Sequence, residues 1–396
     1  MVALYGVVHG IEWNPLIEYP PSICPSLSLR GSLANFPKGT RIGLEGFCPE
    51  DLRKLDRYMG DVGNKHGLRF MGYDPRSGED YWGALEEFCR EKGFDIVYLG
   101  DRQREVDYIR AAVLYEKTRD SELVQEKGES DEKYNRKRIE RNERIYRAKV
   151  LMKKTHELGR DQGMLDNLRK SRVKVAVVGL SHGDLWSARR EELCLDIDSY
   201  SRQTLIGGYG ATEFEEDAKP DPNLVYERES LLREIRFLRT GRIVNERTPD
   251  FVGTWDRHTP SEGYFEMFIS ELDGKTLSGI IEDYNGKAFF SGEFREGILR
   301  FTKYYDPIES GPNANTNFLE YGVRRFDDGW CGYFVARRSW SNDCVFMTRD
   351  VSMQPLNMAL AFDKIVGGLV YPKGKYHTNY LWREMEPLLC EGTELS

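Results

Sequence analysis

Two short apolar runs, each closed by glycine and followed by histidine, stand out in the pattern of hydrophobic and polar positions. One run is Val173–Gly179 and leads to His182, and the other is Val2–Gly6 and leads to His9. A continuous apolar run that ends at glycine is typical of a strand buried on both faces, as in a parallel sheet. In both runs the histidine lies three residues after the glycine. The pattern therefore predicts two buried strands with matching histidines at their carboxyl ends.

Short apolar runs continue to alternate with amphipathic segments through the first half of the chain. Further strands are predicted at residues 41–46, 68–73 and 94–100, and helices at 49–58, 79–92, after 102 and at 139–158. This alternation predicts an α/β domain with a mainly parallel sheet covered by helices. The proline-rich segment 12–38 and the charged segment 125–137 are predicted to be loops, because they offer little apolar periodicity.

The pattern changes after residue 198. Residues 199–248 are polar, contain one amphipathic helix and are predicted to form a helical connector. From 249 to 350, short alternating segments are separated by turn signals such as Asp273-Gly274 and Asn285-Gly286. Such spacing predicts an all-β antiparallel barrel or sandwich. We therefore expect an α/β domain over residues 1–198, the connector, the β domain, and a less periodic C-terminal extension over 351–396.

The composition is that of a folded globular protein. Of 396 residues, 40% are hydrophobic and 31% are charged, and the formal net charge is -8 with a pI near 5.5. Nucleic acid is therefore not the expected partner, because proteins that bind it usually present a basic face. No stretch has the length and apolarity of a membrane span, and the N-terminus lacks the pattern of a secretion signal. Seven cysteines without any Cys-x-x-Cys pair argue against a disulfide framework. We expect a cytoplasmic protein, and the sequence leaves its oligomeric state open.

Histidines, carboxylates and one arginine fall at the predicted carboxyl ends of the strands. They are His9, Glu45, Asp101, Arg102 and His182. Parallel sheets place their ligands at this edge, and two imidazoles beside a carboxylate form a divalent site with open positions. The sequence therefore predicts a metal held by His9, His182 and Glu45, with Glu45 as third ligand or general base.

Arg102 and Arg110 flank the start of a predicted helix at the same edge. They can clamp a substrate carboxylate, a phosphate or an oxyanion, or they can pair with nearby acids such as Glu105 and Asp107. Both alternatives stay open. The remaining histidines are predicted to be surface residues. Glu12, three residues after His9, is expected to be solvated in its loop, and the alternative is that it joins the site. Those histidines are His66, His156, His258 and His377.

Five motifs together resemble the TraB/PrgY-like and Tiki superfamily, which includes erythromycin esterases and ChaN-like haem-binding proteins. They occur in the family's order over about the first 190 residues of the chain, in the sheet-and-helix part of the pattern. The motifs are Gly6-x-x-His9, Leu44-Glu45-Gly46, Gly100-Asp101-Arg102 with Arg110, Glu140-Arg141-Asn142 and Gly179-x-x-His182.

The resemblance implies an α/β fold with paired histidines and a glutamate at the active centre. In Tiki-like members it implies metal-dependent cleavage of a peptide bond, in esterase-like members hydrolysis of a lactone, and in ChaN-like members binding of haem. Our expectation is a metal-dependent hydrolase of a peptide or ester bond, with Mn, Co or Zn and a peptide or small-molecule substrate. The alternative is a non-catalytic protein that binds haem or a small molecule on the same scaffold. Val7 stands where some relatives carry glutamate.

The family resemblance does not extend to the β domain. Its Gly253-Thr-Trp255 followed by antiparallel segments is loosely similar to lipocalin or avidin barrels. The domain is rich in aromatic residues, which either fill its core or line a pocket that recruits an apolar substrate or partner. Arg257, His258 and Arg324-Arg325 are the polar groups that such a pocket would use. The aromatic residues are Trp255, Tyr264, Phe268, Phe289, Phe290, Phe301, Trp330 and Phe334.

Overall fold

The chain divides into two compact units that are discontinuous in sequence. One comprises Met1–Glu116 and Leu151–Val225, and the other Lys117–Val150 and Tyr226–Ser396, whereas the pattern of the sequence predicted four consecutive segments. The computed structural model describes residues 2–7, 27–66, 79–206, 211–244, 246–256, 258–295, 297–306, 318–326, 329–336 and 342–370.

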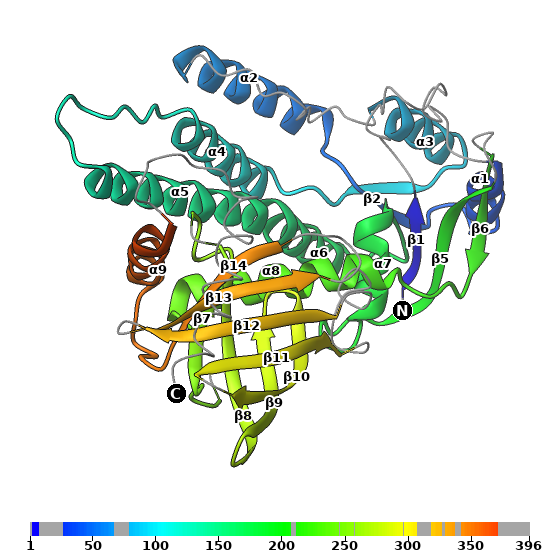
Figure 1. Cartoon of the computed structure of the whole chain (residues 1–396). Helices are drawn as coiled ribbons and strands as arrows, with labels where there is room; N and C mark the ends of the chain where they lie inside the picture. The colour runs from blue at the N-terminus through cyan, green and yellow to red at the C-terminus, as the bar shows by residue number, and fades with distance from the viewer. Residues whose placement is uncertain are drawn as a thin grey trace. The chain divides into compact units, whose positions relative to one another are not determined.

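The first unit is built on a six-stranded sheet in the order β3-β2-β4-β1-β5-β6. Figure 1 labels β1, β2, β5 and β6 of this sheet. Five strands are parallel, and the edge strand β6 pairs antiparallel with β5. The predicted α/β architecture is confirmed, and β1 and β4, the two apolar runs that lead toward histidines, are neighbours. The strands are β1 (Val2–Val7), β2 (Arg41–Leu44), β3 (Asp95–Tyr98), β4 (Val175–Gly179), β5 (Ile197–Ile206) and β6 (Ala211–Glu216).

Both faces of this sheet are covered, which explains why β1 and β4 are apolar at every position. Val175 and Val177 pack on one face with Leu29 of α1 and Leu85 of α3. Ala176 and Val178 pack on the other with side chains of α6 and α7, and Trp186 of α7 is fully buried there. The helices of this unit are α1 (Leu27–Ala34), α2 (Pro49–His66), α3 (Glu79–Glu91), α4 (Arg102–Arg119), α6 (Arg160–Ser171) and α7 (Leu180–Ala188).

Several predicted loops and boundaries were wrong. The helix α1 lies inside the segment 12–38, because Leu29 and Leu33, one turn apart, are both fully buried. The helix α5 (Asp131–Lys153) begins inside the segment 125–137, with acidic residues in its first turn where they suit the helix dipole. The predicted strand at 68–73 lies outside the described residues.

The segment between α5 and α6 is a π-helix, η1 (Lys154–Gly159), and the flanking residues keep right-handed helical backbone angles. π-Helical turns are rare and occur frequently at functional sites. This one lies directly before Arg160 and Asp161.

The second unit contains a closed eight-stranded antiparallel barrel, as predicted (Figure 1). Its strands follow one another in the chain, and β9 pairs with both β8 and β10. Gly274 and Gly286 in the predicted turns have positive φ angles, which favour glycine in tight hairpins. The strands are β7 (Phe251–Thr254), β8 (Tyr264–Asp273), β9 (Thr276–Asp283), β10 (Gly286–Arg295), β11 (Ile298–Tyr305), β12 (Leu319–Phe326), β13 (Gly329–Ala336) and β14 (Asn342–Thr348).

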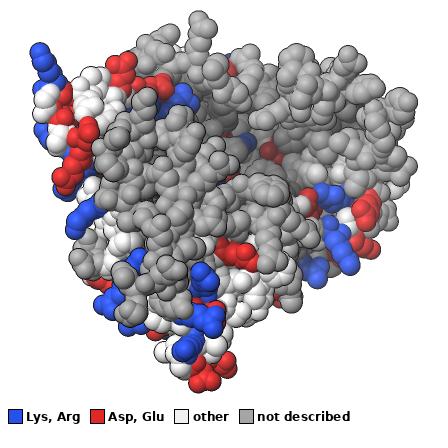
Figure 2. All heavy atoms as spheres, viewed as in Figure 1, with Lys and Arg blue, Asp and Glu red and all other residues white. Residues whose placement is uncertain are grey.

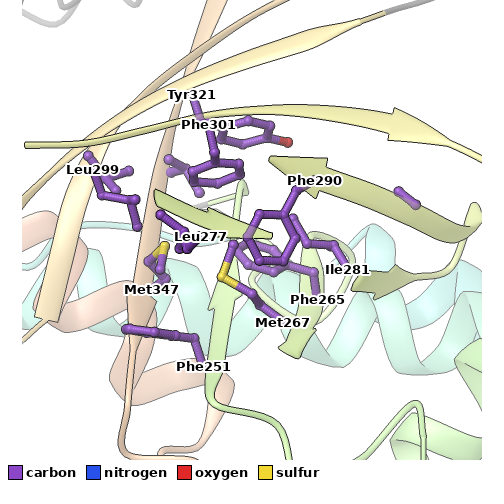
Figure 3. Packing of buried hydrophobic residues seen from close by; sticks show 13 residues of the cluster. Phe251, Phe265, Met267, Leu277, Ile281, Phe290, Leu299, Phe301, Tyr321 and Met347 are labelled. Carbon is purple, nitrogen blue, oxygen red and sulfur yellow. The ribbon is translucent and has the colours of Figure 1, made fainter. Parts of the chain in front are cut away.

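Inward-facing aromatic and aliphatic side chains fill the barrel (Figure 3). Phe301 and Tyr321 stack with ring centroids 4.5 Å apart, and Phe290 lies edge-on to Phe301. Of the aromatic residues singled out in the sequence, Trp255, Phe290, Phe301, Trp330 and Phe334 belong to this core.

Helices cover parts of the barrel's outer surface. Phe237 of α8 (Pro222–Thr240) stacks on Tyr264 of β8 at 4.2 Å. Phe362 of α9 (Pro355–Val370) stacks on Phe346 of β14. The helix α9 corrects the expectation of an aperiodic extension: Met358, Phe362 and Ile365 lie one helical turn apart and are buried.

Charged side chains of both signs are interspersed on the described part of the face drawn in Figure 2. None of the described helices combines the length and the apolarity that crossing a bilayer requires.

Candidate functional site

Glu45 and His182 lie side by side at the carboxyl edge of the sheet. Glu45 directly follows β2, and His182 lies in the first turn of α7, directly after β4. Since β2 and β4 are adjacent and parallel, their carboxyl ends meet at this edge. Glu45 Oε1 lies 3.6 Å from His182 Nε2. The backbone N–H of Gly179 donates to Glu45 Oε2 over 2.5 Å and fixes the carboxylate.

Asp161 of α6 holds the other nitrogen of the same imidazole. Its Oδ1 lies 2.5 Å from His182 Nδ1, and it also accepts a hydrogen bond from Trp186 Nε1 at 3.3 Å. Asp161 is 3% exposed, so these contacts are made away from bulk water. The imidazole is therefore fixed between two carboxylates, with Nδ1 toward Asp161 and Nε2 toward Glu45.

The environment of His182 favours its protonated form. Burial alone would lower the pKa of His182, and the neighbouring charge of Arg160 acts in the same direction. The negative charges of Glu45 and Asp161 outweigh both and raise the pKa above its usual 6.5. The two acids therefore favour a positive charge at this position.

Three further polar side chains extend this cluster, and sequence reasoning assigned none of them to the site. Arg160 Nε lies 3.1 Å from Glu105 Oε2, and Arg160 Nη1 lies 3.0 Å from His156 Nε2. His156 belongs to the π-helical turn η1, and its ring packs on Tyr108. The expectation that His156 is a surface residue was wrong: it is only partly exposed, as is His258.

Burial sets the ionisation of Glu105 and His156. It raises the pKa of the Glu105 carboxyl, which Arg160 lowers in part and Glu45 raises further. It lowers the pKa of His156 from 6.5 to about 4, with additional effects of Arg160 and His182. His156 is therefore neutral at physiological pH, and Glu105 retains its proton to a higher pH than an exposed glutamate.

The sequence did contain two signals for these residues. Glu105, Ile109 and Val113 lie one helical turn apart on the buried side of α4, so Glu105 is a carboxylate placed within an apolar stripe. His156 and Arg160 have the spacing of neighbours on one helix face. Neither signal predicts which strand ends Glu105, His156 and Arg160 lie near.

Arg102 and Arg110 of α4 contact side chains of α2, and Arg110 also pairs with a residue of α4. Arg102 Nη1 lies 3.5 Å from Asp51 Oδ1. Arg110 Nε donates to the Tyr58 hydroxyl at 3.2 Å, and Arg110 Nη1 pairs with Asp107 at 3.6 Å. The pairing of Arg110 with Asp107 is one of the two alternatives that the sequence left open.

Asp101 caps the helix that carries these arginines. Its Oδ1 accepts hydrogen bonds from the backbone N–H groups of Gln103 and Arg104, the interaction of an N-cap residue. The aspartate of the Gly-Asp-Arg motif therefore has a structural role as a helix cap.

The Glu140-Arg141-Asn142 motif lies on α5 in the second unit. Arg141 donates to the carbonyl oxygens of Arg119 and Ser121, and Asn142 donates to the carbonyl oxygen of His258. These hydrogen bonds of Arg141 and Asn142 join segments of the second unit.

Close backbone packing positions the helix α7 that carries His182. A Cβ atom on Gly183 would lie 2.9 Å from the Cα of Gly6 in β1. The buried Asp184 accepts a hydrogen bond from the Tyr200 hydroxyl at 2.7 Å and pairs with Arg202 at 3.2 Å. Gly6 of the first Gly-x-x-His motif therefore packs directly against Gly183, the residue that follows His182 of the second motif.

Of the three predicted metal ligands, the structure brings together Glu45 and His182, whereas His9 lies outside the described residues, as do Glu12 and Arg257. Among the residues that the structure does describe, no group of three or more His, Cys, Asp and Glu side chains has the arrangement of a metal site. Comparisons of the chain with family models, with curated proteins and with solved structures find no match.

Proposed function

We propose that this protein is a metal-dependent hydrolase of a peptide or ester bond. The observation that carries the proposal is the Asp161–His182–Glu45 arrangement at the carboxyl edge of a parallel sheet. Nδ1 of His182 lies 2.5 Å from one carboxylate and Nε2 lies 3.6 Å from the other.

The donor set fits a divalent cation. An imidazole nitrogen beside a carboxylate oxygen suits Mn, Co or Zn. Metal-binding histidines usually donate their second N–H to a carboxylate, which fixes the ring, and Asp161 has this place relative to His182. His182 and Glu45 would hold the ion, with His9 as the second histidine ligand. A bound ion of this kind lowers the pKa of water and polarises a carbonyl group.

The residues of the chain then have distinct tasks. Asp161 orients the imidazole, and the Gly179 N–H orients the Glu45 carboxylate. Because the ion competes with a proton for His182, its affinity should rise with pH. Glu45 is either the third ligand or the general base, and as general base it would take the proton of the attacking water. A positioned general base contributes roughly a hundred- to ten-thousand-fold in rate.

Elemental analysis of the purified protein, combined with hydrolysis assays on peptide and ester panels, tests the proposal. We expect a divalent metal, and we expect Glu45→Gln to lose nearly all turnover while it stays folded. Glu50→Gln, which makes the same change at an exposed glutamate of α2, is the matched control. Hydrolysis that persists in the His9→Ala/His182→Ala double variant would contradict the proposal. A visible absorption band on titration with haemin that His9→Ala abolishes would favour the haem-binding alternative instead.

A further inference from the structure

We propose that Arg160 binds an anionic group of the substrate, so that this site acts on molecules carrying a carboxylate near the bond to be cleaved. This role of Arg160 rests on the proposed hydrolase function, because it treats the bound anion as a substrate. The binding of a carboxylate by Arg160 can be tested separately from hydrolysis.

Two contacts hold the Arg160 guanidinium and leave one nitrogen for a ligand. Nε lies 3.1 Å from Glu105 Oε2, and Nη1 lies 3.0 Å from His156 Nε2. Nη2 has no partner among the residues that the structure describes. The Arg160 side chain is 24% exposed, whereas the Glu105 side chain behind it is 1% exposed. The guanidinium is thus anchored by a buried carboxylate, while its side chain keeps some exposure.

Glu105 provides a second, independent observation. It is fully buried, and in the described part of the structure its Oε1 has no hydrogen-bond partner. A buried carboxylate without full hydrogen bonding is costly. Its ion pair with Arg160 accounts for it: Glu105 is a positioning residue that fixes the plane of the guanidinium.

The neutral state of His156 has a matching consequence. Because its pKa is lowered to about 4, His156 accepts a hydrogen bond from Arg160 without adding a positive charge beside it. Arg160 is therefore the charged member of its pair with His156. A planar guanidinium with fixed orientation binds carboxylates through charge-assisted hydrogen bonds better than a lysine does.

Arg160 is close enough to the centre to act on the same molecule. Arg160 directly precedes Asp161, whose carboxylate contacts the imidazole of His182. A substrate carboxylate on Arg160 would place the neighbouring bond toward His182 and Glu45. Negative charge on the substrate would otherwise be repelled by Glu45 and Asp161, so the site selects anions that reach Arg160.

Calorimetric titration of the full chain with succinate tests the binding step without any need for turnover. We expect Arg160→Met to weaken succinate binding by roughly 10- to 100-fold, the usual strength of a charge-assisted hydrogen bond. Arg160→Lys should recover only part of the loss. Arg169→Met, which removes an exposed arginine of the same helix, should bind succinate like the unaltered chain. Should Arg160→Met fail to fold, the double variant Arg160→Met/Glu105→Gln removes the buried charge as well.

The outcomes separate the two proposals. Absence of succinate binding to the unaltered chain, or equal binding by Arg160→Met, overturns the role of Arg160. Loss of binding in Arg102→Met or Arg110→Met but not in Arg160→Met assigns the anion site to the arginines favoured by the motif. Loss in Arg160→Met from a chain that hydrolyses nothing supports anion binding and contradicts the hydrolase.

A pair of substrates gives the catalytic readout. The nitrophenyl monoester of succinic acid carries a carboxylate that nitrophenyl acetate lacks. We expect the chain to prefer the charged ester through a lower KM, and Arg160→Met to remove this preference while hydrolysis of the acetate continues. Retention of the preference in Arg160→Met would contradict the proposal.

Discussion

The carboxylate of Asp161 is in contact with the imidazole of His182, with 2.5 Å between Oδ1 and Nδ1. Asp161 lies on α6 and His182 on α7, so the contact depends on the packing of both helices on one face of the sheet. Met164 and Leu165 of α6 and Trp186 of α7 belong to the same buried cluster. The orientation of the imidazole is therefore built into the core of the first unit.

Asp161→Asn should weaken the binding of a divalent metal by about 10- to 100-fold, the usual effect of losing the carboxylate behind a metal-binding histidine. The variant should also lower the pKa of His182, because one of the two charges that raise it is removed. Calorimetric titration with Mn and histidine NMR titration measure the two effects. Asp166→Asn, on the exposed side of the same helix, is the control, and equal metal affinity in both variants would contradict this role of Asp161.

His182 and His156 should contribute to stability with opposite dependence on pH. The raised pKa of His182 stabilises the metal-free fold fully below its unfolded value near 6.5, and this stabilisation is lost as pH rises through the folded pKa. The lowered pKa of His156 stabilises the fold above 6.5, and this stabilisation is lost as pH falls toward about 4.

Urea denaturation of His182→Gln and His156→Gln, with a chelator present, measures this difference. His182→Gln should cost most stability at acidic pH, and His156→Gln should cost most at neutral pH. A parallel pH dependence in the two variants would show that these ionisation states are wrong.

Replacement of Lys303 should strongly destabilise the barrel. Its Nζ lies 2.5 Å from Asp283 Oδ2 inside the barrel, and both residues are 2% exposed. Lys303→Met leaves the Asp283 charge buried without its partner, which typically costs about 3–5 kcal/mol. Lys303→Met/Asp283→Asn should recover much of that loss. Urea denaturation compares the two, and a double variant no more stable than the single one would contradict the explanation.

Addition of one methyl group at Gly183 should disturb the support of the site. The new Cβ would lie 2.9 Å from Gly6 Cα and 3.1 Å from the Tyr200 hydroxyl, and such overpacking typically costs about 1–3 kcal/mol. We expect Gly183→Ala to lower the melting temperature and to weaken metal binding. Gly60→Ala on α2, with open space around the new methyl group, should be neutral or stabilising. An equal effect of both variants would exclude close packing as the cause.

The fold could be predicted from the sequence because its strongest signals are local. Apolar runs that end at glycine predicted the central strands β1 and β4, which are covered on both faces. Asp-Gly and Asn-Gly turns predicted hairpins of the barrel. The helix α1 was missed because its apolar surface consists of little more than Leu29 and Leu33. Prolines on both sides of it also made the segment resemble a loop.

The candidate site could be predicted only in part, for a related reason. Glu45 and His182 follow parallel strands, and parallel strands bring their ends to one edge. Asp161, Arg160 and Glu105 lie on helices. The rule that parallel strands bring their carboxyl ends to one edge therefore does not predict where these side chains lie. Their approach to the site depends on how α4 and α6 pack, which no local pattern contains. The units also divide within α4 and α5, so the assumption of consecutive domains assigned residues 117–150 to the α/β domain.

The π-helical turn η1 makes the site sensitive to the length of the chain as well as to its side chains. A π-helical turn holds one residue more than an α-helical turn, so deletion of one residue within 154–159 would convert this segment to α-helix. Met164, Leu165 and Leu168 fix α6 in the core of the sheet, so the change would fall on the residues of the turn. His156 would then lose its position beside Arg160 and Tyr108. A single-codon deletion at this turn should therefore dismantle the cluster more completely than any one substitution in it.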